Sequence, residues 1–368
     1  MERDKPSIYR CDESSAPSTQ LVKRGQTSRI KVDIHCHMSV PDAAALAQPY
    51  FDPALDANSR YTSPEAARVN HAQAPTLKPR LSTVEAKLED MDRMGIDMQV
   101  LSPAPPQYYY WADPDLGRET SQIINNRIAE AVALHPDRFA GLATLPMQAP
   151  ELAVLEMRRA VNELGLKGIE ISTNVMGAEL SQPQFFPILK EAEELGILVF
   201  LHPLGFSHGE RMIQHYFNNV IGNPLESTVA LSHLIFGGVL DRFFGLKICV
   251  AHGGGYLASY SGRMDHAWRV RDDCRGCEHL PSSYLNRLWF DTVVFDPEYL
   301  AYLVKKFGPE KILMGTDHPF DMGDTDPIGL ICSVPGLSEE DTWRILGGNA
   351  CELLGLSPNR VGQDSEQT

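Results

Sequence analysis

Short apolar runs alternate with longer amphipathic segments through most of this chain. The short runs predict eight strands, at Ile30–His35, Asp97–Leu101, Phe139–Leu145, Gly168–Ser172, Ile197–His202, Leu246–Ala251, Leu288–Val293 and Lys311–Thr316. The longer segments have apolar residues three and four positions apart, which predicts helices at Val84–Met94, Glu119–Leu134, Glu151–Leu164, Phe186–Leu195, Thr228–Phe243, Pro297–Phe307 and Glu339–Leu354. This alternation predicts an α/β fold, a parallel (β/α)8 TIM barrel rather than an open sheet.

Two connections are longer than ordinary barrel loops. Residues 38–80 follow the first strand and residues 203–226 follow the fifth. Both leave the C-terminal end of a strand, where barrels carry their sites, so we expect lids or binding loops. The barrel domain is expected over residues 29–355. The polar residues 1–28 predict an N-terminal arm, disordered or packed on a partner subunit, and residues 356–368 predict a frayed tail.

The composition is that of an ordinary globular protein, with 43% hydrophobic and 22% charged residues in a chain of 368. A formal net charge of -15 repels phosphate backbones and argues against nucleic-acid binding as the main role. The N-terminus lacks a basic start followed by an apolar run, so no signal peptide is expected. No apolar stretch is long enough to span a membrane.

The seven cysteines are odd in number and scattered without framework spacing. This pattern predicts reduced thiols in a cytoplasmic protein. Cys274 and Cys277 form a CxxC pair, but no second pair completes a structural zinc site. Incidental loop thiols are therefore favoured over a redox or zinc motif.

The first predicted strand runs into the tripeptide His35-Cys36-His37. Side chains alternate between the two faces of a strand, so His35 and His37 project the same way and offer two imidazoles to one point. A metal ion is the economical use of such a pair, although two unrelated loop histidines would give the same short pattern.

Further polar residues stand at the ends of other predicted strands. His202 ends the fifth strand, His252 ends the sixth before three glycines, and Asp317 ends the eighth. A barrel would bring these residues and the first-strand pair to the same end of the ring of strands. This convergence favours a metal site, because isolated packing residues would not all gather at one end. Cys36 and His318 face away from their neighbours by alternation, so we expect packing or support of the ligands from them.

These motifs resemble a known family. The HxH motif, the Phe-Leu-His-Pro and His-Gly-Gly-Gly runs and the Gly-Thr-Asp-His-Pro-Phe run are similar to the amidohydrolase superfamily, and within it to the aminocarboxymuconate-semialdehyde decarboxylase-like branch. The resemblance covers roughly residues 30–355. Strand four, Gly168–Ser172, carries no lysine that would bridge two metals, which favours a mononuclear site.

The resemblance implies a role for each motif residue. His35, His37, His202 and Asp317 would hold one divalent metal ion with a bound water, zinc being favoured and manganese the alternative, without an organic cofactor. His252 would be the acid/base, and Asp317 is a second candidate for protonating the substrate.

Two arginines after the sixth strand match the family's carboxylate-binding arginines. Arg263 and Arg271 would hold a substrate carboxylate through bidentate hydrogen bonds, one of them from a neighbouring subunit, which implies a homodimer or larger homo-oligomer. A solvated charged helix face is the alternative. A further family arginine has no clear counterpart, since Arg80 is displaced, and this leaves the exact substrate open. The aromatic loop 102–111 could line a pocket or simply pack.

The resemblance implies a non-oxidative decarboxylase of an aromatic or muconate-type carboxylic acid. A metal lowers the pKa of bound water toward ~7, and a histidine can take and return a proton. The same ligands would also suit a hydrolase of a lactone, amide or ester. A non-catalytic barrel that binds a carboxylate is the third hypothesis, which the intact ligand set disfavours.

Overall fold

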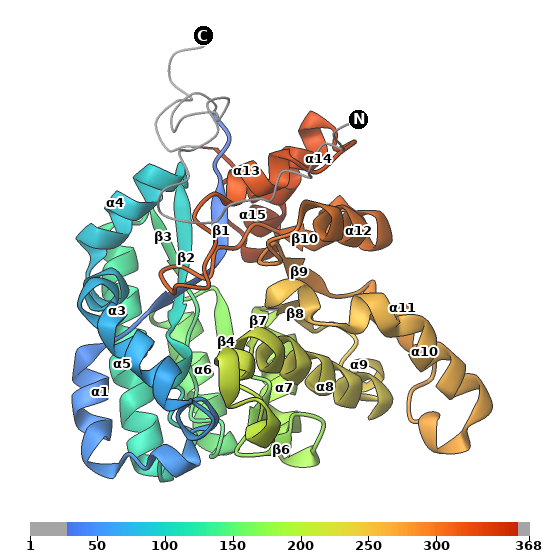
Figure 1. Ribbon diagram of the computed structural model, residues 1–368, viewed down its shortest axis with the longest axis horizontal. Helices are drawn as coiled ribbons and strands as arrows, with labels where there is room; N and C mark the ends of the chain where they lie inside the picture. Colours follow the sequence, from blue (N-terminus) through green and yellow to red (C-terminus); the bar gives the residue numbers. More distant parts are fainter. Residues whose placement is uncertain (1–27, 360–368) are drawn as a thin grey trace.

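The computed structural model describes residues 28–359. The predicted arm, 1–28, lies outside the described residues except for Ser28, and so do residues 360–368 of the predicted tail, 356–368; both stay predictions. Parallel strands gather at the centre of the molecule with helices around them (Figure 1). No helix among residues 28–359 has the length and apolar character needed to cross a membrane.

Eight parallel strands make up the barrel. They are β1 (Val32–Met38), β2 (Met98–Pro103), β3 (Phe139–Gly141), β4 (Gly168–Ser172), β7 (Leu198–His202), β8 (Lys247–Val250), β9 (Trp289–Asp291) and β10 (Ile312–Leu313). Hydrogen bonds link β1-β2-β3 and β10-β9-β8-β7-β4 into two sheets. Parallel bridges between Cys36 and His318 and between Ala143 and Ile169 join the sheets into a ring. The predicted TIM barrel is confirmed. A short hairpin, β5 (Asn174–Val175) and β6 (Ala178–Glu179), lies outside the ring sequence.

Several strands differ in length from the prediction. The third and eighth strands are shorter than expected, because the chain leaves regular pairing after Gly141 and Leu313. Beyond β10, the backbone N–H of Met314 donates instead to the carbonyl of Ile345. The first strand is longer and changes register between Asp33 and Cys36. A bulge of this kind re-aims side chains, and this one lies at the start of the HxH motif.

The helices that alternate with the strands are α4 (Val84–Met94), α5 (Pro114–Leu134), α6 (Pro150–Asn162), α7 (Phe186–Leu195), α8 (Asn223–Phe236), α9 (Val239–Arg242), α10 (Leu257–Val270), α11 (Pro281–Leu285), α12 (Pro297–Phe307), α13 (Pro327–Cys332), α14 (Glu339–Trp343) and α15 (Asn349–Leu354). The single helix expected over Thr228–Phe243 was wrong. Gly237 and Gly238 separate α8 from α9, and Gly238 has φ +67°, a conformation that ends a helix.

The long connection after the first strand is largely helical. It contains α1 (Pro41–Ala47), α2 (Ala57–Arg60) and the 19-residue α3 (Pro64–Ser82). Ser63 caps α3, because its side chain accepts a hydrogen bond from the N–H of Ala66. This segment is therefore a structured addition to the barrel.

A cluster of buried side chains fills the barrel below the site. Val32, Val100, Phe200 and Leu313 belong to it, and α15 adds Leu354 from the other end. The ring of Phe200 lies 5.0 Å from the ring of His35. Apolar packing thus supports the polar residues at the barrel mouth from beneath.

Candidate metal centre

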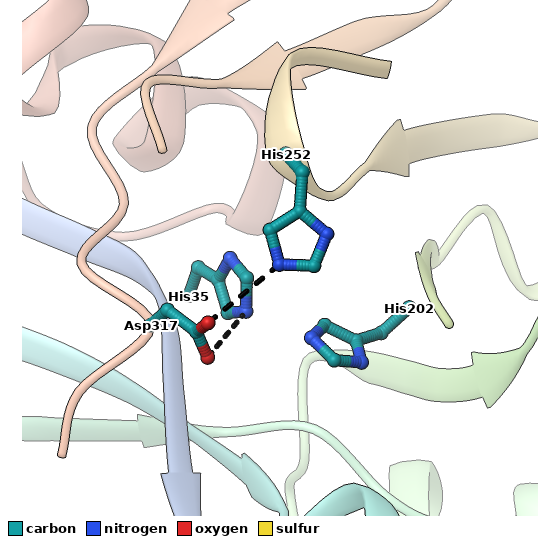
Figure 2. A group of neighbouring side chains, drawn as sticks. All are labelled: His35, His202, His252 and Asp317. Atoms are coloured by element: carbon teal, nitrogen blue, oxygen red, sulfur yellow. Dashed lines mark ion pairs between the residues drawn. The ribbon is translucent and has the colours of Figure 1, made fainter. Parts of the chain in front are cut away.

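The predicted site residues come from four separate barrel strands. His35 and His37 lie on β1, and His202 is the last residue of β7. His252 is the second residue after β8, and Asp317 is the fourth residue after β10. All are C-terminal strand positions, so the parallel barrel brings them to the same end (Figure 2).

The ligand atoms of this group converge. One such atom from each of His35, His202, His252 and Asp317 lies within 4.8 Å of the others. Figure 2 shows the side chains of the three histidines and Asp317 directed toward one another, with Nε2 of His35 and Nε2 of His252 at 3.4 and 3.6 Å from the Asp317 carboxylate oxygens. The Nε2 atom of His37 lies 3.1 Å from Nε2 of His35 and 3.1 Å from Oδ1 of Asp317. The structure therefore brings all five predicted residues together.

The outer hydrogen bonds of the two β1 histidines determine which nitrogen faces inward. Nδ1 of His35 donates to Oδ2 of Asp291 at 2.6 Å, and Nδ1 of His37 donates to the carbonyl of Pro103 at 3.2 Å. Neutral imidazoles then carry their lone pairs on Nε2, the atoms that face each other and Asp317. Two such lone pairs at 3.1 Å repel each other unless a proton or a metal ion lies between them. Their arrangement is that of metal ligands.

His202 gives an independent indication that the site binds a metal ion. It is buried, and neither of its ring nitrogens has a hydrogen-bond partner among the described residues. Burial lowers the pKa of His202 well below its usual range, and the neighbouring histidines lower it further. A neutral imidazole with a free lone pair is a metal ligand by type, so the donor set fits a divalent metal ion.

Asp291 is a site residue that the sequence prediction missed. Its side chain is fully buried, and Oδ1 accepts a hydrogen bond from the N–H of Gly253 at 2.8 Å while Oδ2 holds His35. It therefore orients a β1 histidine and the turn that carries His252. The sequence feature that could have identified Asp291 is a charged residue at the end of the apolar seventh strand.

Two site residues have strained backbones. His252 has φ +57° and Asp317 has φ +58°, values that non-glycine residues rarely adopt. Such conformations cost of order 1–3 kcal/mol each and cluster at functional sites. Here they lie in the turns that follow β8 and β10.

The aromatic loop after β2 braces the barrel. Tyr108 and Tyr110 are buried; the Tyr108 hydroxyl donates to Oε1 of Glu170 at 2.8 Å, and the Tyr110 hydroxyl accepts from the N–H of Ser172. Both contacts are to β4, so packing accounts for these two tyrosines. Glu170 occupies the interior of strand four, and its Oε2 lies 3.9 Å from Nδ1 of His37.

The predicted supporting residues lie behind the cluster. His318 faces away from the other histidines, and its Nε2 bonds Oδ2 of Asp90 on α4 at 2.8 Å. Cys36 donates from Sγ to the carbonyl of Val100. Lys87, also on α4 and fully buried, donates from Nζ to the carbonyl of His37. α4 thus holds the ends of β1 and the eighth-strand loop together.

The two predicted substrate arginines are not brought to this cluster. Arg263 is exposed on α10. Arg271 follows that helix, is also exposed, and makes a bidentate ion pair with Asp273 at 2.9 and 2.6 Å. Figure 1 shows α10 and α11 extending outward from the ring of helices. Within one chain, Arg263 lies on the solvated helix face that was the alternative expectation, and Arg271 is exposed just beyond the end of that helix.

The barrel and its histidine–aspartate rim define a metal-dependent amidohydrolase-type protein. The amidohydrolase family model matches residues 32–356, and the chain belongs to this family. The predicted superfamily is confirmed.

Several proteins that are similar to this chain are decarboxylases. The chain is 41% identical over 278 residues to 2-amino-3-carboxymuconate-6-semialdehyde decarboxylase of Dictyostelium discoideum, covering 75% of this chain and 77% of that one. The solved 5-carboxyvanillate decarboxylase of Sphingomonas paucimobilis superposes with a TM-score of 0.80 at 26% identity, over 90% of this chain and 100% of the other. A dihydroxybenzoic acid decarboxylase of Polaromonas, solved with manganese and 2-nitroresorcinol, gives 0.76 at 25% identity, over 89% and 97%.

Proposed function

We propose that this protein is a metal-dependent, non-oxidative decarboxylase of an aromatic or muconate-type carboxylic acid. One observation carries the proposal: imidazole nitrogens and the Asp317 carboxylate converge at a barrel mouth, and no side chain within residues 28–359 separates them. Family membership and the decarboxylase names of the similar proteins support it.

The ligands proposed for a single divalent ion are His35, His37, His202 and Asp317. The absence of a lysine from β4 supports one ion rather than a bridged pair. Imidazole nitrogens suit zinc, whereas manganese prefers oxygen ligands yet is present in the Polaromonas neighbour. Zinc stays our first choice, with manganese as the alternative. A bound ion of either kind supplies a Lewis acid and lowers the pKa of a bound water.

His252 is proposed as the acid/base. Its side chain is 13% exposed, whereas His35 and His37 are fully buried, so it is the more accessible imidazole. Its Nε2 faces Oδ2 of Asp317, and its Nδ1 has no partner among the described residues. Loss of carbon dioxide leaves an electron pair on the substrate carbon. His252 would deliver the proton that this carbon takes up, which balances the reaction without an oxidant.

Substrate carboxylate binding is proposed to involve a second copy of the chain. Arg263 is exposed on a helix that extends outward from the barrel, which suits a side chain that enters a neighbouring subunit. A homodimer or larger homo-oligomer follows from this proposal. A cytoplasmic location is also proposed, supported by the free thiols of the cysteines within residues 28–359.

Ultraviolet screening of aromatic carboxylic acids tests the function. We expect metal-dependent loss of absorbance together with one carbon dioxide released per acid consumed. The chelated enzyme and the His252→Ala variant are the controls, and both should be inactive. Consumption of esters, lactones or amides without carbon dioxide release would instead identify a hydrolase.

A further inference from the structure

Glu170 is a buried acidic residue in the middle of β4. Its neighbours Ile169 and Ile171 belong to the apolar layer between the strands and the helices, so by alternation Glu170 points the other way, into the barrel. Its side chain is fully buried. Removing a carboxylate from water is unfavourable unless it is paired, so the partners of Glu170 decide what it does inside the ring of strands.

The partners of Glu170 within residues 28–359 leave one of its oxygens free. The Tyr108 hydroxyl donates to Oε1 at 2.8 Å, whereas Oε2 has no hydrogen-bond partner in this part of the chain. The nearby hydroxyl of Ser102 gives its proton to the carbonyl of Cys36 at 2.8 Å, so it has none for Glu170. The charged partner of Oε2 is instead His37, whose Nδ1 lies 3.9 Å away. The free oxygen is therefore next to a proposed metal ligand.

Each of the two β1 histidines thus has a buried acid on its Nδ1 side. Asp291 of β9 accepts from Nδ1 of His35 at 2.6 Å. Nδ1 of His37 donates to the neutral carbonyl of Pro103 at 3.2 Å, and Glu170 of β4 adds a carboxylate on the same side of the ring. In the ring of strands, β9 and β4 lie on either side of β1. A carboxylate beside the Nδ1–H group makes the opposite nitrogen of an imidazole a stronger metal ligand.

We propose that Glu170 is a positioning residue of the metal site. Its negative charge attracts the Nδ1–H group of His37, which keeps Nε2 directed at the ion and raises the electron density that Nε2 offers. The buried carboxylate lowers the stability of the metal-free protein, and its charge is balanced when a divalent cation is bound. Glu170 therefore exchanges stability for metal affinity. The inference rests on the proposed metal-dependent function.

The test substitutes Glu170 by glutamine, which keeps the side-chain volume and an oxygen that accepts from Tyr108 but removes the charge. Zinc affinity, measured by competition with a chromophoric chelator, should fall roughly ten-fold, the lower end of the range for residues that support a metal-binding histidine. The thermal unfolding midpoint of the metal-free protein should stay the same or rise, because a buried charge with one hydrogen bond is removed. A merely structural role predicts the reverse, unchanged zinc affinity and a lower midpoint.

Glu156→Gln is the matched control. Glu156 is another buried glutamate, on α6, but both of its oxygens are paired, with the side chains of Asn125 and Arg159. Its substitution should lower the unfolding midpoint and leave zinc affinity unchanged, because a buried ion pair is broken away from the metal site. A loss of zinc affinity that Glu156→Gln shows to the same extent as Glu170→Gln would come from general destabilisation and would overturn the inference.

Metal binding by the wild type separates this inference from the function on which it rests. Equal zinc affinity of wild type and Glu170→Gln would overturn the role of Glu170 and leave the metal site intact. Weaker zinc binding by Glu170→Gln supports the inference even if the wild type releases no carbon dioxide from any acid, in which case only the proposed reaction fails. Failure of the wild type to bind zinc or manganese would overturn both proposals.

Discussion

At the scale of single residues, the central feature is a set of histidine nitrogens and Asp317 oxygens that converge at the barrel mouth. Asp291 and Pro103 take the outer protons of His35 and His37, so the inner nitrogens present lone pairs to each other. His202 is buried, and neither of its ring nitrogens finds a partner in the part of the chain that the structure describes. Substituting one residue at a time tests which of these side chains bind the metal and which one transfers the proton.

Substituting His252 by alanine should abolish turnover but leave the metal bound. The other three histidines and Asp317 remain, while the proton donor is lost, so kcat should fall by roughly 10²–10⁴. Mass spectrometry measures whether the metal is still bound, and carbon dioxide release measures turnover. His71→Ala, an exposed histidine on α3, is the matched control. Retained activity would remove His252 from the chemistry.

Asp291→Asn should weaken metal binding by roughly ten- to one-hundred-fold, because the amide no longer takes a proton from Nδ1 of His35 as a carboxylate does. Competition with a chelator measures the affinity. An unchanged dissociation constant would show that His35 needs no orienting carboxylate.

The sequence predicted the five rim residues because each ends an apolar strand. Asp291 was not predicted as a site residue, because its role depends on contact with His35, which is 256 positions away in the chain. The strained backbones of His252 and Asp317 could not be predicted for another reason: a left-handed conformation at a non-glycine residue has no sequence signature. Such positions are found only when the fold is known.

At the scale of elements, α4, α7 and α12 match their predicted bounds, since amphipathic spacing and a following glycine define both ends. The helix α3 was missed because Pro75 and Pro79 lie inside it, where a break is expected.

The turn after β8 offers a test at this scale. Gly255 has φ +68°, and a Cβ there would lie 2.2 Å from the carbonyl oxygen of Pro224 on α8. Gly255→Ala should therefore lower the free energy of unfolding by at least about 1–3 kcal/mol and displace His252. Urea denaturation measures the loss. Gly262→Ala, on α10 with no atom of residues 28–359 within 4 Å of the new carbon, should be neutral or slightly stabilising. Equal stability of the two variants would contradict the packing described.

At the scale of the whole molecule, one chain supplies the metal ligands but leaves Arg263 and Arg271 on an exposed surface. Their predicted role therefore depends on a neighbouring copy, which neither the sequence nor the fold of one chain can place. An active-site complementation experiment examines this directly.

Mixing Arg263→Ala with His252→Ala should restore activity that neither variant has alone. If Arg263 acts across a dimer, each hybrid holds one intact site, and random exchange would give at most about a quarter of wild-type activity. Mixing followed by a carbon dioxide assay gives the result. Full activity of Arg263→Ala by itself would show that this arginine belongs only to the solvated helix face and does not bind the substrate.

The most direct test of the account is anomalous diffraction from crystals grown with zinc or manganese. We predict one strong peak at the barrel mouth, about 2.0–2.2 Å from nitrogens of His35, His37 and His202 and from an oxygen of Asp317. No peak between these side chains, or one coordinated by other residues, would contradict the metal site and the decarboxylase that depends on it.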